Sequence, residues 1–371
     1  MAANTLTVII GRFQPFHRGH RKLFEHASTI SKDALVLIGS AFRPRSSRYA
    51  FTWDERASFI ETALKSAGID LNITCLPLVD TLYDDATWAG NVRTAIDLHL
   101  RNHVIDPEET KIVLVGNDEV ESSKYLTAFP EYETLIVEAA TSKGVTLNAT
   151  DLRDSIFMDK FEREELCQVY GTAEIYQLMA WMENNSSAVE KIRTDAEYCK
   201  NHRIEMIRSS KGYGHEIPMN CAEAIVVHSG HILLTEREES DGILALPGML
   251  LERETSLDAA IRAMHEQTQL DVSADALKAS LAGRTVFDHL ERSDRGWLRT
   301  EAFNFELEET PNQPKISAGA GIVRAEWLPI NQLTPDVMFE DHFDIIQSMI
   351  PIVPFAYSSV LMSQYQLGLA Q

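Results

Sequence analysis

Short apolar runs alternate with helical segments through the first 180 residues, and this alternation constrains the fold more than any other feature of the chain. Buried strands are predicted at Leu6–Ile10, Ala34–Gly39, Ile73–Leu78, Lys111–Val115 and Thr134–Glu138. The clearest helix is Thr52–Ala67, which has the capping box of Thr52 and Glu55 at its start. Strands separated by helices predict an α/β fold with a doubly wound parallel sheet, whose ligands bind at the carboxyl ends of the strands.

From Ala222 onward the pattern is different, because strands with alternating polarity surround one strong helix, Leu257–Thr268. These strands are predicted at Ala222–His228, His231–Glu236, Arg284–Phe287, Ala302–Leu307 and Arg324–Pro329. The pattern indicates a second domain of the α+β class. We therefore predict a first domain at 1–183, a linker with a short charged helix at 184–218, and a second domain at 219–371.

The composition is that of a globular protein with two domains, since 44% of the 371 residues are hydrophobic and 24% are charged. Four scattered cysteines without a C-x-x-C pair indicate neither a disulfide framework nor a zinc site. No apolar run approaches a membrane span and no secretory signal opens the chain, so we expect a cytoplasmic protein. The net charge of −21 argues against a nucleic-acid partner, while a homo-oligomer stays open.

The segment Gly11–His20, Gly-Arg-Phe-Gln-Pro-Phe-His-Arg-Gly-His, joins the first strand to the first helix. Main-chain N–H groups and the helix dipole make such a junction an anion site. His17 and His20 are three residues apart and lie on one face of the first helical turn. Histidines at a helix start are otherwise commonly solvated or capping residues, but this placement favours a role in binding a nucleotide triphosphate.

A second element supports this interpretation, because another helix is predicted to open at Thr150. Thr150 is expected to be its N-cap, and Arg153 follows one turn later. A helix N-terminus with an arginine supplies positive potential for a departing pyrophosphate.

Gly11–His20 resembles the signature of the H-x-G-H nucleotidyltransferase superfamily, in the form found in archaeal-type nicotinamide mononucleotide adenylyltransferases that some bacteria fuse to a Nudix domain. Three further segments share this resemblance: Ala50–Arg56 with P-F-T-x-x-E-R, Tyr83–Trp88 with Y-x-x-x-x-W, and Leu147–Arg153 with I-S-S-T-x-x-R. The family's Gly-His-x-Lys-Asp stretch is altered at Gly116–Tyr125, where acidic residues replace the lysine. This change puts the affinity in doubt more than the reaction.

The resemblance implies direct adenylyl transfer, in which the phosphate of nicotinamide mononucleotide attacks the α-phosphorus of ATP and releases pyrophosphate. It implies that His17, His20 and Arg153 hold the triphosphate, which brings Mg²⁺ with it. Trp88 would stack on the nicotinamide ring, although a place in the core is the ordinary alternative. The implied substrate-binding residues are Gly11, Arg12, Phe13, Gln14, Arg48, Trp88, Asn91 and Thr150.

In the second domain, residues 246–270 resemble a Nudix box, G-x5-E-x7-R-E-U-x-E-E-x-G-U. The residues in register include Gly248, Glu254, Arg262 and Glu266. The box sets three carboxylates at i, i+3 and i+4 of one helix, where they hold Mg²⁺ or Mn²⁺ against a diphosphate.

The box is incomplete here, because the three positions read Ala263, Glu266 and Gln267, and Gln269 replaces the closing glycine. Glu266 is the one metal ligand left, and a single carboxylate holds a divalent ion poorly. The resemblance implies ADP-ribose as the substrate, and we expect its hydrolysis to be weak or absent. The acidic residues that could substitute for the lost ligands are Asp288, Glu291 and Glu301.

Three alternatives remain at this point. An active enzyme could also hydrolyse ADP-ribose, a superfamily member could use pantetheine phosphate or nicotinate mononucleotide as acceptor, and a regulator could bind nucleotides without catalysis. His17, His20, Thr150 and Arg153 together disfavour the regulator, and Trp88 disfavours pantetheine phosphate.

Overall fold

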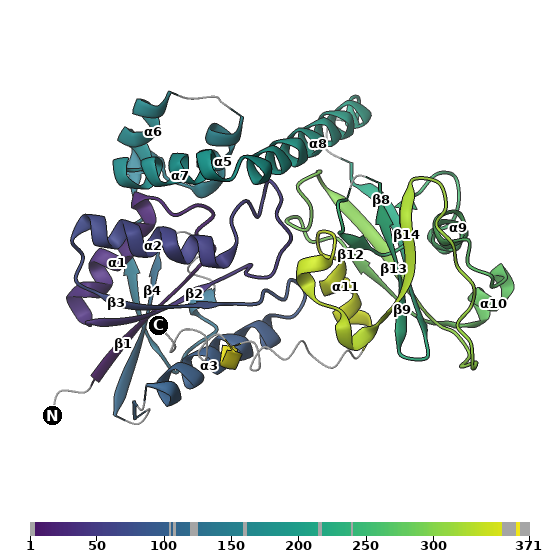
Figure 1. Cartoon of the computed structure of the whole chain (residues 1–371), viewed down its shortest axis with the longest axis horizontal. Coiled ribbons are helices and arrows are strands. Elements are labelled where there is room, and N and C mark those ends of the chain that lie inside the picture. The colour runs from purple at the N-terminus through teal and green to yellow at the C-terminus, as the bar shows by residue number, and fades with distance from the viewer. Residues whose placement is uncertain are drawn as a thin grey trace. The chain divides into compact units, whose positions relative to one another are not determined.

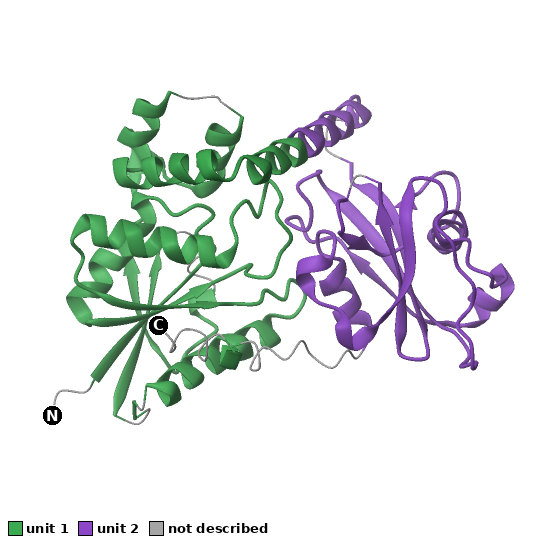
Figure 2. Cartoon of the chain, in the orientation of Figure 1, with its two compact units in different colours: residues 1–196, 356–371 green, residues 197–355 purple. Residues whose placement is uncertain are grey.

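The computed structural model describes residues 4–103, 105–106, 109–118, 125–158, 162–213, 217–238, 240–350 and 361–363. The chain divides into two compact units, Met1–Ala196 with Ala356–Gln371 as unit 1 and Glu197–Phe355 as unit 2 (Figure 2). The predicted boundaries at 183 and 218 stay a prediction. Within the described residues, no helix combines the length and apolar character that crossing a membrane requires.

Unit 1 contains the predicted doubly wound sheet, and this fold prediction is confirmed (Figure 1). Its parallel strands, in the spatial order β3-β2-β1-β4-β5, are β1 (Asn4–Gly11), β2 (Asp33–Ile38), β3 (Asn72–Pro77), β4 (Thr110–Asn117) and β5 (Glu133–Val137). The central strands are almost completely buried, as their continuous apolar runs predict.

Helices cover both faces of this sheet (Figure 1). The helices α1 (Arg18–Ile30) and α2 (Trp53–Ala67) lie on one face, and α3 (Asp85–Asn102) lies on the other. The strand order reverses between β1 and β4, because the chain moves outward through β2 and β3 before it returns to β4. A crevice at such a switch point, beyond the carboxyl ends of the strands, is where α/β sheets bind their ligands.

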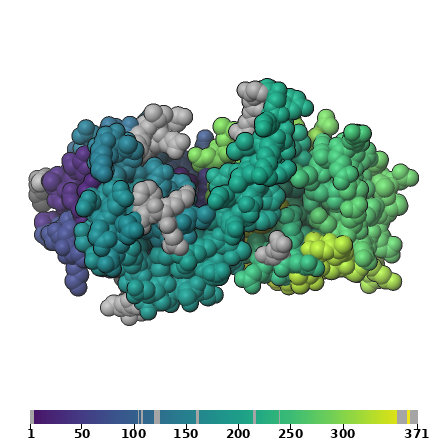
Figure 3. Space-filling model, turned by 90° about the horizontal axis from the view of Figure 1, so that it is seen from above, coloured from purple at the N-terminus to yellow at the C-terminus, as the bar shows by residue number. Residues whose placement is uncertain are grey.

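The end of unit 1 is helical. A two-stranded ribbon of β6 (Thr141–Ser142) and β7 (Val145–Thr146) precedes α5 (Ala149–Phe157), α6 (Arg163–Tyr170), α7 (Thr172–Asn184) and α8 (Ser186–Ser210). The expectation of a short helix in the linker is wrong, since α8 has 25 residues and continues across the boundary between the units. Atoms of α8 form part of the surface seen in Figure 3. Val189 and Ile192 are buried in the core of unit 1, which lengthens this helix beyond what its polar sequence indicated.

Unit 2 has a 7-stranded mixed sheet with helices on both faces, as the α+β prediction requires. Its strands are β8 (Met219–His228), β9 (His231–Arg237), β10 (Leu244–Ala245), β11 (Gly248–Leu250), β12 (Leu281–Phe287), β13 (Leu298–Glu306) and β14 (Ile322–Pro329). Its helices are α9 (Ser256–Thr268), α10 (Ala274–Ala279), the 3₁₀ turns Ile330–Gln332 and Pro335–Val337, and α11 (His342–Met349).

The two faces of this sheet follow from the alternation of side chains along β8. Ala222, Ala224 and Val226 pack in the core with α9. Glu223 points to the opposite face, where it contacts His342 at the start of α11. The helix with the Nudix-like residues therefore covers one face, and α11 covers the other.

Candidate active site

The first turn of α1 holds the two histidines side by side. His17 is the N-cap, and its Nδ1 accepts a hydrogen bond from the main-chain N–H of Gly19 at 3.1 Å. The main-chain N–H of His17 donates to Nδ1 of His20 at 3.3 Å, which completes a capping box made of two imidazoles. The rings stack with their centroids 3.9 Å apart. Both rings thus lie at the positive end of the helix dipole.

The hydrogen bonds and the burial together fix the chemical state of this pair. Each Nδ1 atom accepts a hydrogen bond, so the proton of each neutral ring is on Nε2. Burial lowers the pKa of His17 well below 6.5, and the neighbouring charges of His20 and Arg18 lower it further. Burial also lowers the pKa of His20 to about 3. The pair therefore presents uncharged N–H donors at neutral pH.

One of these donors is free. Nε2 of His17 is buried and has no hydrogen-bond partner among the described residues. A buried polar group without a partner is unfavourable, and such groups occur where a ligand supplies the missing partner. This atom therefore marks the place where an anionic oxygen fits.

Arg153 on α5 reaches the same turn from the other end of unit 1. It donates from Nη1 to the carbonyl of Gln14 at 2.5 Å and from Nε to the carbonyl of Ser47 at 3.1 Å. It also donates from Nη2 to the hydroxyl of Thr150 at 3.3 Å. The second predicted element thus meets the Gly11–His20 segment in space.

The expected capping role of Thr150 is wrong. The N-cap of α5 is Asn148, whose side-chain oxygen accepts from the main-chain N–H of Asp151 at 2.8 Å. The helix begins two residues earlier than expected because Asn148 is itself a strong capping residue. Thr150 lies in the first turn, where its hydroxyl is the acceptor for Arg153.

Two residues expected to bind substrate instead support the turn with their side chains. Gln14 is 3% exposed, and its amide donates to the carbonyl of Phe51 at 2.7 Å and accepts from the N–H of Phe51 at 3.0 Å. Phe13 is 2% exposed and packs its ring against His20, with 5.1 Å between centroids. A contact of either residue with substrate would have to come from the main chain.

The other expected substrate-binding residues lie around this crevice. Gly11 ends β1, Arg12 is exposed just beyond it, and Arg48 lies over the ring of Tyr49 at 5.9 Å. Trp88 and Asn91 are three residues apart on α3, and both are half-buried.

Trp88 is linked to the end of β1 through one neighbour. Its ring centroid lies 6.0 Å from that of Tyr125, whose hydroxyl donates to the carbonyl of Ile10 at 3.3 Å. The altered motif at Gly116–Tyr125 can be followed only in part, because residues 119–124 lie outside the described residues.

The sequence did not indicate two arginine contacts that support this site. Arg56 is fully buried and donates to main-chain carbonyls at the ends of β1 and β2. Arg45 forms a bidentate ion pair with Glu55, which also accepts from the indole of Trp181 at 2.9 Å. Both Arg56 and Glu55 belong to a recognised motif, but its spacing does not show what their side chains bond.

In unit 2, the structure brings the Nudix-like residues together but engages them with one another. Gln267 donates to the carbonyl of Gly248 at 2.8 Å and accepts from its N–H at 3.2 Å. One amide side chain therefore occupies both polar main-chain atoms of the residue that opens the box.

The arginine of the box neutralises its carboxylates. Arg262 forms two hydrogen bonds with Glu254 and a longer one, 3.4 Å, with Glu266. These bonds lower the pKa of Glu254 and raise that of Arg262. Among the residues that the structure describes, no group of three or more His, Cys, Asp or Glu side chains is arranged to hold a metal ion.

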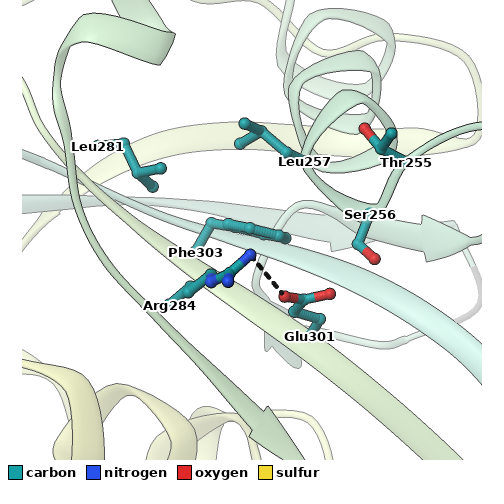
Figure 4. A pocket seen from close by; sticks show the side chains of 7 residues that line it. All are labelled: Thr255, Ser256, Leu257, Leu281, Arg284, Glu301 and Phe303. Carbon is teal, nitrogen blue, oxygen red and sulfur yellow. Dashed lines mark ion pairs between the residues drawn. The ribbon is translucent and has the colours of Figure 1, made fainter.

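A small pocket of about 280 Å³ opens at the other end of α9 (Figure 4). It is lined by Thr255, Ser256, Leu257, Leu281, Arg284, Glu301 and Phe303. Glu301 faces Arg284 there, 3.8 Å away, and so belongs to this pocket. Since Ser256 and Gln267 are 11 residues apart, about 16 Å along a helix, Glu301 is badly placed to replace a carboxylate beside Gln267. Asp288 and Glu291 are exposed after β12 and do not complete such a group either.

Comparisons with known proteins agree with this division of chemistry. Residues 8–141 match the cytidylyltransferase-like family. The nicotinamide/nicotinic acid mononucleotide adenylyltransferase of Acinetobacter baylyi is 30% identical over 153 residues, which cover 41% of this chain and 76% of that relative. The nicotinamide-nucleotide adenylyltransferase of Pyrococcus horikoshii is 30% identical over 146 residues, 39% of this chain and 69% of that relative.

A solved structure extends the similarity through both units. It is a bifunctional NMN adenylyltransferase/ADP-ribose pyrophosphatase from Francisella tularensis, in complex with AMP and a manganese ion. The two structures match with a TM-score of 0.80 and 26% sequence identity, over 93% of this chain and 98% of that one.

Proposed function

The chain belongs to the nicotinamide mononucleotide adenylyltransferase family, and we propose that the crevice between β1 and α5 carries its reaction. The enzyme makes NAD and pyrophosphate from nicotinamide mononucleotide and ATP. One observation carries the assignment of the site: a pair of neutral imidazoles at a helix N-terminus, with Nε2 of His17 unpartnered, lies in the same segment that Arg153 bonds.

We propose that the residues act by position and charge. An oxygen of the mononucleotide phosphate forms a bond to the α-phosphorus of ATP while the bond from that phosphorus to the bridging oxygen breaks, and the electron pair leaves with pyrophosphate. His17 and His20 donate from Nε2 to phosphate oxygens, whose negative charge grows on the leaving group. Arg153 adds a positive charge beside the departing phosphates. No side chain needs to form a covalent intermediate.

The other contacts in this site are also proposals. Trp88 stacks on the nicotinamide ring, since a flat cation is attracted to an aromatic face. Arg12, Arg48 and Asn91 contact the substrates, and Gly11 allows the close approach of a phosphate. Mg²⁺ binds to the phosphates of ATP and offsets their charge. This fits a chain whose described residues contain no preformed group of metal ligands.

The experiment is an assay of NAD and pyrophosphate formation from ATP and nicotinamide mononucleotide. We expect wild-type turnover, and a loss of roughly 10²–10³-fold in His20→Ala, the size seen when one stabilising donor is removed. Glu266→Ala in unit 2 is the control and should leave NAD formation unchanged. An inactive wild-type enzyme, or a His20→Ala variant at the wild-type rate, would refute the assignment.

For unit 2 we propose that the hydrolysis of ADP-ribose is weak or absent. The Francisella structure holds AMP and manganese, but the residues at the box of this chain do not fit a metal ion. Gln267 replaces a carboxylate and engages Gly248, and Arg262 pairs with Glu254 and Glu266. The intact alternative, an active second site, remains the competing hypothesis.

Release of AMP from ADP-ribose with Mg²⁺ or Mn²⁺ separates these two hypotheses. Turnover comparable to NAD formation and abolished in Glu266→Ala would favour the active site. Gln267→Glu supplies a second readout, because the new carboxylate is repelled by the Gly248 carbonyl. It should strengthen Mn²⁺ binding measured by electron paramagnetic resonance, whereas Gln269→Glu, with the same added charge, should not.

We also propose that the enzyme works in the cytoplasm. Its four cysteines are free thiols, as is usual in a reducing compartment. ADP-ribose as a ligand of unit 2, and a homo-oligomer, are further proposals that the two assays and a sedimentation experiment address.

A further inference from the structure

Arg56 is a fully buried cation that the adenylyl-transfer mechanism does not use. It lies in the first turn of α2, with 0% of its surface exposed. Burial lowers its pKa to about 10, although the charges of Asp80, Asp54 and Glu55 oppose the shift. Burying a charge is unfavourable unless its hydrogen bonds are satisfied, so the partners of Arg56 show what this position provides.

All four hydrogen bonds of Arg56 end on main-chain carbonyls. Nη1 donates to Arg12 at 2.5 Å and to Gly39 at 2.7 Å. Nη2 donates to Ser40 at 3.1 Å, and Nε donates to Thr52 at 3.1 Å. A single guanidinium thus ties the turn after β1, the end of β2 and the start of α2.

The carbonyls that Arg56 bonds flank two strained residues. Phe13 and Ser40 both have φ at +50°, a left-handed conformation that side chains other than glycine disfavour. The Arg12 carbonyl belongs to the peptide before Phe13, and the Gly39 and Ser40 carbonyls belong to the peptides on either side of Ser40. Such conformations persist only where the surroundings hold them, and they gather at functional sites.

The strained turn is in direct contact with the histidine pair. The ring of Phe13 meets the ring of His20 at 5.1 Å, edge to face. It also lies against Gly11, where an added Cβ would be 2.7 Å from the Phe13 ring. A change in the backbone at Arg12 would therefore move Phe13, and with it the ring of His20.

We propose that Arg56 is a positioning residue for adenylyl transfer, which fixes the Gly11–Phe13 turn and so the orientation of His20, without touching the substrates. The proposal rests on the proposed function of His20. It predicts that the planar fork of arginine is required. Lysine keeps the charge but has one point donor, which cannot reach carbonyls on three segments.

The test compares Arg56→Lys with a matched core variant of the same helix. Leu64→Ala, also buried on α2, should lower the melting temperature and leave the kcat and KM of the folded enzyme unchanged. Arg56→Lys should lower kcat roughly 100-fold, the loss that a small misplacement of a reacting group can cause. Wild-type kcat and KM in folded Arg56→Lys would overturn the proposal, while NAD formation by the wild type would still support the function.

A double variant tests the route through His20. If Arg56 acts by orienting His20, then Arg56→Lys should have little further effect on kcat in a His20→Ala background, because residues that act as a unit are not additive. Two full, multiplicative losses would show that Arg56 acts elsewhere.

Arg56→Lys could fail to fold, and Ser40→Gly then provides a second background. Glycine adopts φ +50° without strain, so Ser40→Gly should restore folding to the lysine variant. The loss of kcat should persist there, since the turn at Phe13 is still unsupported. Recovery of the wild-type kcat in this double variant would contradict the positioning role.

Discussion

Both units contain a glutamine whose amide bonds the N–H and the C=O of one distant residue, and the two bonds have opposite consequences. In unit 1, Gln14 holds Phe51 and leaves the donor at Nε2 of His17 without a partner. In unit 2, Gln267 holds Gly248 and thereby occupies atoms of the Nudix box itself. The same side-chain chemistry supports an open site in one unit and closes a site in the other.

The arginines of the two units differ in the same way. Arg56 and Arg153 donate to main-chain carbonyls, which are neutral acceptors, so their charge remains available to a polyphosphate. In unit 2, Arg262, Arg292 and Arg295 pair with carboxylates, which cancel their charge. A net charge of −21 is thus compatible with an anion site, because the local acceptors decide the field at the site.

The largest expected contrast is between two arginine deletions. Arg153→Ala removes a positive charge beside the proposed leaving group and should lower kcat/KM for NAD formation by roughly 10²–10³-fold, as for other stabilising donors. Arg262→Ala should leave this activity unchanged, because its charge is already paired with Glu254. Steady-state kinetics of both variants measure the difference. Equal losses would break the comparison.

The next contrast is in stability. Gln14→Ala strands the N–H and C=O of Phe51 in the core, and each unsatisfied group costs about 1–3 kcal/mol, so a loss of roughly 2–4 kcal/mol is expected. Gln267 is half-buried, so water can replace its bonds to Gly248 and Gln267→Ala should cost about 1 kcal/mol. Urea unfolding of both variants checks the order. A larger loss in Gln267→Ala would show that the closed box is the more important of the two for stability.

The sequence was sufficient to predict both folds, because apolar periodicity decides strands such as Leu6–Ile10 and helices such as Leu257–Thr268. It also predicted that Arg153 would meet the Gly11–His20 segment. It could not predict the bonds of Gln14 and Arg56, since these join residues more than 15 positions apart whose pairing only the packed sheet creates. The cap at Asn148 and the length of α8 were missed for a local reason: two strong capping residues compete at one site, and tertiary burial of Val189 and Ile192 overrides a polar sequence.

The histidine pair makes the stability of unit 1 depend on pH. The folded state holds the pKa of His17 well below 6.5, whereas the unfolded chain protonates near 6.5. Unfolding therefore takes up a proton below pH 6.5, and the free energy of unfolding falls as the pH falls, by up to about 1.4 kcal/mol per pH unit for one histidine. Hydrogen exchange of the α1 amides between pH 7.5 and 5 should show this decline. His17→Gln should flatten it, and an unchanged slope in that variant would assign the effect to other groups.

The smallest expected effect compares how α2 and α9 end. Both helices finish with a left-handed residue, Gly68 with φ +66° in unit 1 and Gln269 with φ +45° in unit 2. Glycine adopts this conformation without strain, whereas glutamine does so at a cost of about 1 kcal/mol. Gln269→Gly should therefore stabilise unit 2 by about 0.5 kcal/mol, less than the full strain because the side chain also accepts from Ser317 and because glycine loosens the unfolded chain. Gly68→Gln should destabilise unit 1 by about 1 kcal/mol, and thermal unfolding of the reciprocal pair measures both shifts. If both substitutions destabilise, Gln269 is held by its own contacts, and the closing position of the box has been rebuilt around glutamine as fully as Gly248 has been rebuilt around Gln267.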